Sequence, residues 1–422
     1  MSPDTLTRMA SGVRVDGNQA NIARGNWTVL ALLVASVAIN YIDRGNLSVA
    51  GRDLSAELRL TPDRLGLLFS AFFWTYALFQ IVAGWLVDRY DVVRVYAAGY
   101  LIWSAATMCT GLVSTVSALF ALRLLLGMSE SVAYPSYARI IATNFREERR
   151  GISNALIDAG SRGGPAVGVL AGGLLLEHYG WRVMFLAIGA ASLLWLAPWM
   201  VLAPTVSRAP DGHRNDIGRG FAEILRRKEA WGTFVGLFAG NYAWYFLLTW
   251  MPPWLLMERH YSRHAMAVYG WLPYAALAIS SLAGGWLSDR LITRGVAPTV
   301  RRRFAASAFL ACAVLLIPSC ICRDERIALG LLILACIALA QWSAQCWAIT
   351  QTLAGTARCG KWVGLQNGFG NLAGITVPWI TGEIVQKTGS FYPSFVAVGA
   401  VLVVGALAYH FLIPRVAPVR FA

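Results

Sequence analysis

Long apolar runs separated by short polar segments follow one another along almost the whole chain of 422 residues. A helix that crosses the roughly 30 Å hydrocarbon core of a bilayer needs about 20 apolar residues, whereas transmembrane strands are shorter and alternate in polarity. The runs therefore predict membrane-spanning helices. Twelve of them can be drawn, near 27–50, 64–87, 92–113, 117–141, 153–176, 182–202, 231–256, 266–288, 302–320, 327–352, 361–386 and 391–413.

A six-residue motif at the end of the second run recurs at the end of the eighth. Gly84-Trp85-Leu86-Val87-Asp88-Arg89 returns as Gly285-Trp286-Leu287-Ser288-Asp289-Arg290, 201 positions later. Because each copy closes an apolar run and begins a short basic loop, the pattern predicts an all-α membrane protein of two pseudo-symmetric six-helix bundles. The expected segments are an N-terminal tail over 1–26, bundles over 27–202 and 231–413, a linker over 203–230, and a C-terminal tail over 414–422.

Composition and charge distribution agree with a membrane class. Hydrophobic residues make up 57% of the chain, charged residues 14%, and the mean hydropathy is +0.54. The net charge of +14 raises the alternative of nucleic-acid binding, but 23 of the 36 Lys and Arg fall in segments on the side of the termini, 9 on the opposite side and 4 within the runs. This asymmetry predicts a multi-pass protein of the inner (plasma) membrane with both termini cytoplasmic. The lipid bilayer is its expected partner, and nucleic acid is not, because no recognition motif accompanies the charge.

Charged side chains within the predicted spans are the first candidates for function, because each costs about 2.5–3.5 kcal/mol at the bilayer centre. The first half carries three such pairs, Asp43 with Arg44, Arg123 with Glu130, and Asp158 with Arg162. Arg123 and Glu130 share one helix face, and the last pair has the i,i+4 spacing of a direct ion pair. A buried salt bridge that only fixes helix packing is the alternative. A cavity with water is favoured for the first two pairs, and both interpretations stay open for Asp158 and Arg162.

Several motifs together resemble those of one transporter family. They are Asn40-Tyr41-Ile42-Asp43-Arg44-Gly45-Asn46-Leu47-Ser48, the repeated loop motif, Arg123-Leu-Leu-Leu-Gly127-Met-Ser-Glu130, Phe246-Leu-Leu-Thr-Trp250 with Pro252, and Gly370-Asn371. These strings are similar to signatures of the anion:cation symporter family within the major facilitator superfamily, and most of all to bacterial galactonate, glucarate and hexuronate transporters. The resemblance extends over nearly the whole chain.

The resemblance implies the major facilitator fold and a proton-coupled uptake of an organic anion, a sugar acid or other carboxylate or dicarboxylate, by rocker-switch alternating access. Asp43 and Glu130 would bind protons, and Arg123 would pair with the ionised Glu130. Arg44 would neighbour the substrate, since a guanidinium group binds a carboxylate in a bidentate way. The proton gradient would supply energy, with no cofactor, no metal and no enzymatic activity. The expected partners are a small carboxylate and protons, and the protein is expected to be a monomer.

Neutral polar side chains are implied to bind the hydroxyl groups of the substrate. Together with Arg44, Arg123 and Arg162, the substrate-binding set is Tyr41, Tyr76, Ser161, Asn241, Tyr245, Asn367 and Asn371. A hydrogen bond to a neighbouring helix is the alternative role for each neutral member. Four Trp are candidates for the walls of the pocket, Trp244, Trp250, Trp347 and Trp379. The residues implied to gate the transport path are Gly84, Asp88, Arg89, Asp289 and Arg290.

Two features of the sequence bear on the chemical class of the transported substrate. Related sugar-acid transporters are largely neutral where this chain has Asp158 and Arg162, so the additional Arg favours a diacid over a monoacid. The alternative function is a proton-coupled exporter of drugs or lipophilic compounds on the same fold, and the cavity arginines argue against cationic cargo. An intramembrane enzyme would need a catalytic constellation, but no nucleophile motif occurs and the five His form no metal-ligand pattern.

Overall fold

The computed structural model describes residues 17–145, 147–204 and 222–419, without the side chains of some residues inside these ranges. Most of the predicted tail over 1–26 and of the linker over 203–230 lies outside the described residues. The first half contains α2 (Gly17–Val49), α3 (Gly51–Leu58), α4 (Pro62–Arg89), α5 (Val92–Thr110), α6 (Val116–Glu130), α7 (Ala133–Asn144), α8 (Glu147–Val167), η1 (Gly168–Gly172), α9 (Gly173–Leu194) and α10 (Leu196–Leu202). The second half contains α12 (Lys228–Met257), α13 (Arg263–Gly270), α14 (Leu272–Thr293), α15 (Val300–Ile321), α16 (Glu325–Thr388) and α17 (Tyr392–Leu412).

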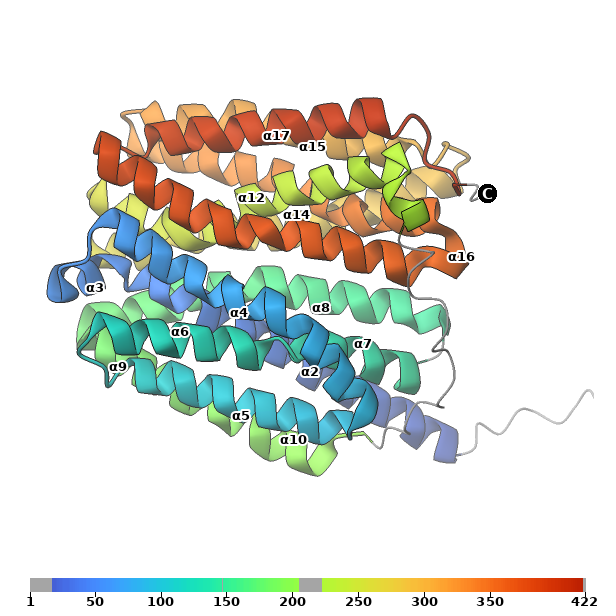
Figure 1. Ribbon diagram of the computed structural model, residues 1–422, viewed down its shortest axis with the longest axis horizontal. Helices are drawn as coiled ribbons and strands as arrows, with labels where there is room; N and C mark the ends of the chain where they lie inside the picture. Colours follow the sequence, from blue (N-terminus) through green and yellow to red (C-terminus); the bar gives the residue numbers. More distant parts are fainter. Residues whose placement is uncertain (1–16, 146, 205–221, 420–422) are drawn as a thin grey trace, which may run out of the picture.

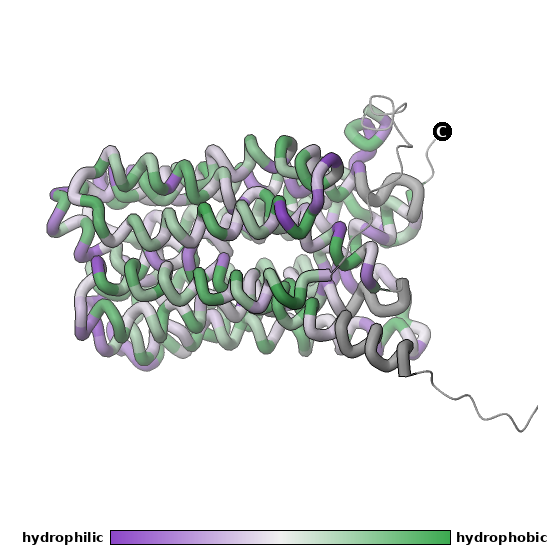
Figure 2. Tube along the Cα trace, turned by 90° about the horizontal axis from the view of Figure 1, so that it is seen from below, coloured by the Kyte–Doolittle hydropathy of each residue, from purple (hydrophilic) through white to green (hydrophobic). Residues whose placement is uncertain are grey.

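The helices stand side by side in two groups, α2 to α10 and α12 to α17 (Figure 1). All long helices run along the same axis, so the molecule has two ends. One end carries α3, and the C-terminus marks the other. Hydrophobic residues cover much of the length of the helices, as Figure 2 shows. This is the predicted all-α membrane architecture of two bundles.

Eight segments of the described chain are long and apolar enough to cross a membrane. One of them, 153–202, holds two spans, because Gly180 turns the chain with φ 79° and ψ 170°. Gly355, with φ 61°, divides α16 in the same way. Side chains disfavour positive φ, and glycine does not. The long helix α4, the long helix α12 and the part of α16 after Gly355 complete the twelve spans that the apolar runs predict.

Proline residues decide where two of the spans are interrupted. The fourth span is predicted as one helix over 117–141, but α6 ends at Glu130 and α7 begins at Ala133. Pro135 has no N–H to bond the carbonyl of Ser131, so the regular helix is lost there. Pro165 lies inside α8, just before the π-helical turn η1. The break after α6 places Glu130 at a helix end in the middle of the protein.

The two bundles are joined at the end that carries α3 and α13, called here the α3 end. Gly66 of α4 packs against α16 so closely that a Cβ there would meet the Pro378 carbonyl oxygen and lie 3.1 Å from Gly382 Cα. Near it, Ser70 Oγ donates a 2.8 Å hydrogen bond to the carbonyl of Ile375. Small residues permit this backbone approach, which is how membrane helices associate tightly.

Ionic contacts close the same end. Arg263 of α13 pairs with Asp53 of α3, and His264 Nδ1 lies 3.0 Å from Glu177 Oε2 of α9. Within the first bundle, Glu57 accepts hydrogen bonds from Trp181 Nε1 at 2.7 Å and from Arg182 at 2.6 Å. The α3 end is therefore a closed seam between the bundles in this conformation.

Candidate functional site

Arg44 lies at the centre of an aromatic cage between α2 and α4. Its guanidinium carbon is 4.6 Å from the ring centroid of Tyr41, 4.8 Å from that of Phe72 and 4.6 Å from that of Tyr76. The residue is 4% exposed. A guanidinium group that stacks on aromatic rings is stabilised by the negative faces of the rings. The cage allows a full positive charge to remain in the protein interior.

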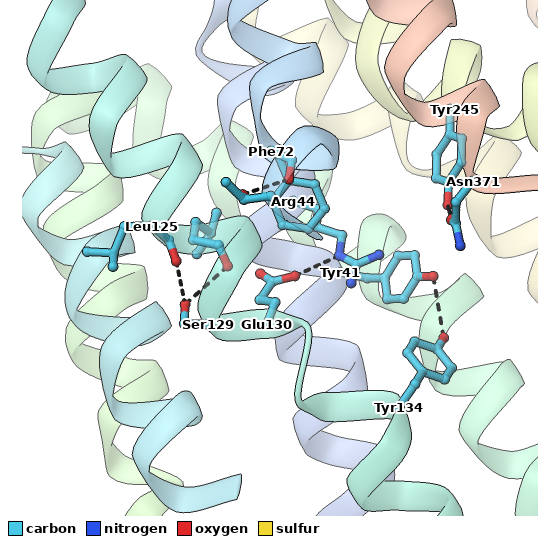
Figure 3. A network of polar contacts seen from close by, with 11 residues as sticks. Tyr41, Arg44, Phe72, Leu125, Ser129, Glu130, Tyr134, Tyr245 and Asn371 are labelled. Carbon is cyan, nitrogen blue, oxygen red and sulfur yellow. Dashed lines mark hydrogen bonds and ion pairs between the residues drawn. The ribbon is translucent and has the colours of Figure 1, made fainter. Parts of the chain in front are cut away.

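Glu130 forms an ion pair with Arg44. Arg44 Nε donates to Glu130 Oε2 at 2.8 Å, and both side chains are almost completely buried (Figure 3). The predicted pair of Arg123 with Glu130 is therefore wrong for this conformation. Seven residues of helix place Arg123 about 10 Å further along the axis, where its guanidinium carbon lies 5.4 Å from the Phe72 ring. Helix periodicity put both residues on one face, but a neighbouring helix supplies the nearer cation.

Several buried polar atoms around this pair have no hydrogen-bond partner in the part of the chain that the structure describes. They are both carboxylate oxygens of Asp43, Glu130 Oε1, Arg44 Nη2, Arg123 Nε and the side-chain amides of Asn40 and Asn46. Buried polar groups are bonded in most native structures, so a cluster without partners needs an explanation. Groups that exchange partners, protons or ligands during function provide one.

The second bundle presents neutral polar groups to the cage. Tyr245 OH donates to Asn371 Oδ1 at 3.0 Å, and Asn371 Nδ2 donates to Asn367 Oδ1 at 3.3 Å. Figure 3 shows Tyr245 and Asn371 on the far side of Tyr41 from Glu130. Asn241 Nδ2 is bonded to the carbonyl of Gly370 at 3.1 Å. Three of these residues thus form one hydrogen-bonded network beside Arg44, while Asn241 is used for helix packing.

Asp158 and Arg162 of α8 form the ion pair that their spacing predicts, with Arg162 Nε 3.7 Å from Asp158 Oδ1. The Arg162 guanidinium carbon also lies 4.7 Å from the ring of Trp244 in α12. The rings of Trp244 and Tyr41 are 6.4 Å apart. Ser161 bonds the Asp158 carbonyl of its own helix. Trp244 therefore connects the two charged centres across the bundle interface.

The other three Trp residues proposed as pocket walls differ in their burial. Trp250 is buried between the bundles and donates to the carbonyl of Pro378 at 3.1 Å. Trp347 is partly buried. Trp379 is 48% exposed, and its place in a pocket wall stays a prediction. A Trp on the outside of a membrane helix suits contact with lipid or the membrane interface.

The predicted gating residues lie near the end opposite α3. Gly84 has open space where a Cβ would be. Arg89 stacks 5.8 Å from Trp85 and Arg290 5.0 Å from Trp286, so the two motif copies repeat one contact. Asp289 pairs with Arg301 at 2.7 Å. The side chain of Asp88 lies outside the described residues.

Residues that the sequence analysis missed complete the cage. Phe72 precedes Tyr76 by four positions, and this spacing on one helix face was a usable signal. Tyr134, whose OH lies 3.4 Å from Tyr41 OH, comes after the helix break and gave no such signal. Its contact depends on the turn between α6 and α7.

Comparison with known proteins decides the family. The sequence model of the Major Facilitator Superfamily matches residues 33–358 of the chain. The chain belongs to this superfamily. The expected membership of the major facilitator superfamily is thereby confirmed, and this major facilitator protein is a transporter and not an enzyme.

Curated relatives cover nearly the full length of this major facilitator protein. It is 28% identical to a probable galactarate/D-glucarate transporter, GudP of Bacillus subtilis, over 92% of this chain and 91% of that protein. It is 31% identical to a probable sulfoacetate transporter, SauU of Cupriavidus necator, over 92% and 93%. It is 29% identical to a D-galactonate transporter of Escherichia coli, over 94% and 97%.

A solved structure shares the fold. The inward-facing, unoccupied structure of a bacterial homologue of the human lysosomal transporter Spinster matches with a TM-score of 0.77. The match has 19% identity and covers 92% of this chain and 97% of that one. At this identity the likeness supports the fold alone.

Proposed function

We propose that this transporter takes up an organic anion together with protons. The names of its relatives specify galactarate/D-glucarate, sulfoacetate and D-galactonate, which are all organic acids. The observation that carries the proposal is the buried Arg44–Glu130 pair. It combines a cation that can bind an acid with a carboxylate that can bind a proton.

Arg44 is the proposed binding group for the substrate carboxylate. Cation–π contacts with three rings stabilise the charge of the guanidinium group. Glu130 accepts a hydrogen bond only from Nε on the edge of the guanidinium group, and Nη2 is without a partner among the described residues. A carboxylate bound in a bidentate way would use this edge. The network of Tyr245 and Asn371 would then bond the hydroxyl groups of a sugar acid or a related carboxylate.

Glu130 and Asp43 are the proposed proton sites. A proton on Glu130 would remove the negative charge that holds Arg44 Nε and would free that edge for the substrate. Proton and anion would therefore enter together, and the charge of Arg44 would be balanced at each stage. Asp43 is completely buried with no partner for either oxygen in the described chain, although the Thr107 hydroxyl is near. Such a group is suited to accept and release a second proton.

Alternating access is proposed as rocker-switch motion of one bundle against the other. The closed α3 end would face the outside, since both termini are proposed to be cytoplasmic by the positive-inside rule. Breaking the seam between α4 and α16 would open that side. The substrate path lies between the two bundles of one chain, so a monomer in the plasma membrane would suffice, with the proton gradient as its energy source.

The test is uptake of a panel of labelled sugar acids, aldarates and other carboxylates by purified protein in proteoliposomes. Accumulation should need an inward proton gradient, and Asp43→Asn should abolish gradient-driven accumulation. Glu130→Gln, which keeps an acceptor for Arg44 Nε, should still exchange labelled for unlabelled anion. Exchange of a lipophilic cation for protons, with no movement of any carboxylate, would reject the proposal and favour the exporter.

A further inference from the structure

Arg162 is a second guanidinium group at the bundle interface, and the proposed coupling of Arg44 with Glu130 leaves it without a role. Its side chain is 12% exposed, and its Nε has no hydrogen bond in the described part of the chain. Asp158 is its nearest carboxylate, but a separation of 3.7 Å is too long for a hydrogen bond. The ion pair therefore leaves the donors of Arg162 available.

Arg162 is mostly buried, but open space lies beside it on its own helix. The Asp158 side chain is 38% exposed, and a Cβ added at Gly163 would meet nothing within 4 Å. Trp244, by contrast, is 2% exposed and provides a fixed aromatic surface under the guanidinium group. Arg162 shares with Arg44 a guanidinium group over an aromatic ring and a buried N–H without a partner among the described residues. Both centres thus present N–H groups that no described residue uses.

The two centres lie on either side of one aromatic pair. Arg44 stacks on Tyr41, Tyr41 contacts Trp244, and Trp244 stacks on Arg162. The first cation belongs to α2 and the second to α8, while Trp244 comes from the opposite bundle. A substrate that reached both cations would lie across Tyr41 and Trp244. It would need an anionic group at each end.

We infer that Arg162 binds a second anionic group of the substrate and makes the transporter selective for dianions over monoanions. This assignment rests on the proposed function, because it presumes that Arg44 binds the first carboxylate. The chemistry required is a carboxylate at one end of a short polar chain and a second carboxylate or a sulfonate at the other. A single guanidinium group gives no reason to prefer such a molecule over a monoacid of equal length.

The experiment compares two six-carbon acids of the same hydroxyl configuration, an aldaric acid with two carboxylates and an aldonic acid with one. Concentration-dependent uptake into proteoliposomes is measured for both acids with the unaltered protein and with Arg162→Gln, Arg162→Lys and Arg326→Gln. Arg326 is exposed at the α3 end and serves as the matched control. Thermal unfolding of each purified variant reports separately whether it is folded.

The unaltered protein should take up the aldaric acid with the lower KM. Arg162→Gln should raise the KM for the aldaric acid about 10- to 100-fold, the cost of a lost charged hydrogen bond, and should leave the aldonic acid within about twofold. Arg162→Lys should recover part of the loss, because charge remains without the planar fork. An equal loss for both acids, or none for either, would overturn the assignment of Arg162 alone. If the unaltered protein takes up neither acid but accumulates another carboxylate of the panel, the inference fails and the proposed function stands; if it takes up no carboxylate at all, both fail.

Discussion

Ser48 Oγ donates a 2.6 Å hydrogen bond to the backbone carbonyl of Thr249, which belongs to the opposite bundle. That carbonyl is free because Pro253, four residues later in α12, has no N–H to bond it. Proline in one bundle thus creates an acceptor that a hydroxyl of the other bundle satisfies. The bond joins α2 to α12 and stabilises the conformation in which the α3 end is closed.

Ser48→Ala should therefore shift the protein toward opening of the α3 end. Loss of one buried hydrogen bond is worth about 1 kcal/mol, or about a fivefold change in the ratio of the two states. Double electron–electron resonance measures this ratio from the distance between two spin labels. The labels are placed at the exposed positions Arg59 and Lys387, one in each bundle. Ser319→Ala is the control, since Ser319 Oγ donates to the Leu316 carbonyl of its own helix. An unchanged distance distribution would show that the bond does not contribute to closure.

Gly66→Ala should prevent the α3 end from closing. A Cβ at this position would meet the Pro378 carbonyl and the backbone of Gly382, and overpacking costs about 1–3 kcal/mol. The spin-label distances should lengthen and uptake should fall about tenfold or more. Gly330→Ala, where a Cβ has open space, should leave both measurements unchanged. Normal uptake by Gly66→Ala would mean that α4 and α16 need no such close approach.

Arg44→Lys should weaken anion binding although it keeps the positive charge. An ammonium group cannot stack on Tyr41, Phe72 and Tyr76 or bind a carboxylate with two parallel hydrogen bonds. The expected loss of affinity is about 10- to 100-fold, measured by ligand-induced thermal stabilisation of the purified protein. Arg326→Lys, at an exposed position, should bind as the unaltered protein does. Equal affinity of the two variants would show that charge alone is sufficient at this position.

Tyr245→Phe should affect substrate orientation. The hydroxyl that donates to Asn371 Oδ1 would be lost, and the amide could turn away from the substrate hydroxyls. KM should rise about three- to tenfold while kcat stays within about twofold, because one neutral hydrogen bond contributes about 0.5–1.5 kcal/mol. Tyr392→Phe is the control at a partly exposed position of α17. A fall in kcat alone would contradict the binding role.

The contact of Glu57 with Trp181 should make stability depend on pH. The hydrogen bond from the Trp181 indole and the neighbouring Arg182 hold the pKa of Glu57 below its ordinary value of 4.5. The ionised group therefore stabilises the fold above that pH, and the contribution disappears as the pH falls through the lowered value. Glu57→Gln should lower the Tm at pH 7 by no more than about 2 °C, because the pair is exposed. The difference should vanish in acid, and a difference that persisted unchanged would contradict the assignment.

Much of the fold follows from local properties of the sequence. The length of the apolar runs sets the spans, since every backbone polar group in lipid must be bonded within its own helix. Glycine at positions 180 and 355 allows the turns between spans, as the polar breaks in the pattern predicted. The break between α6 and α7 also has a local cause, because Pro135 lies in the sequence there. The fourth span was nevertheless predicted as one helix, because its apolar run is continuous.

The candidate site was predictable only in part. Charges within the spans identified Asp43, Arg44, Glu130 and Arg162, since the cost of burying a charge makes such residues conspicuous in any sequence. Their partners were not predictable. The family resemblance implied Arg123 as the partner of Glu130, and helix periodicity placed the two on one face. Neither showed that Arg44 of another helix lies nearer, because the rotation of one helix against another depends on packing along its entire length.

The sequence by itself determined the membrane class, the two repeated halves and the identities of the charged residues, because these depend on composition and on spacing along one chain. Tertiary structure alone decided that Arg44 pairs with Glu130, that Ser48 meets the Thr249 carbonyl, and that Trp244 connects Arg44 and Arg162 through Tyr41. Each of these contacts joins residues from different helices. Their distances depend on how the helices rotate, bend and pack against one another, which no local pattern specifies.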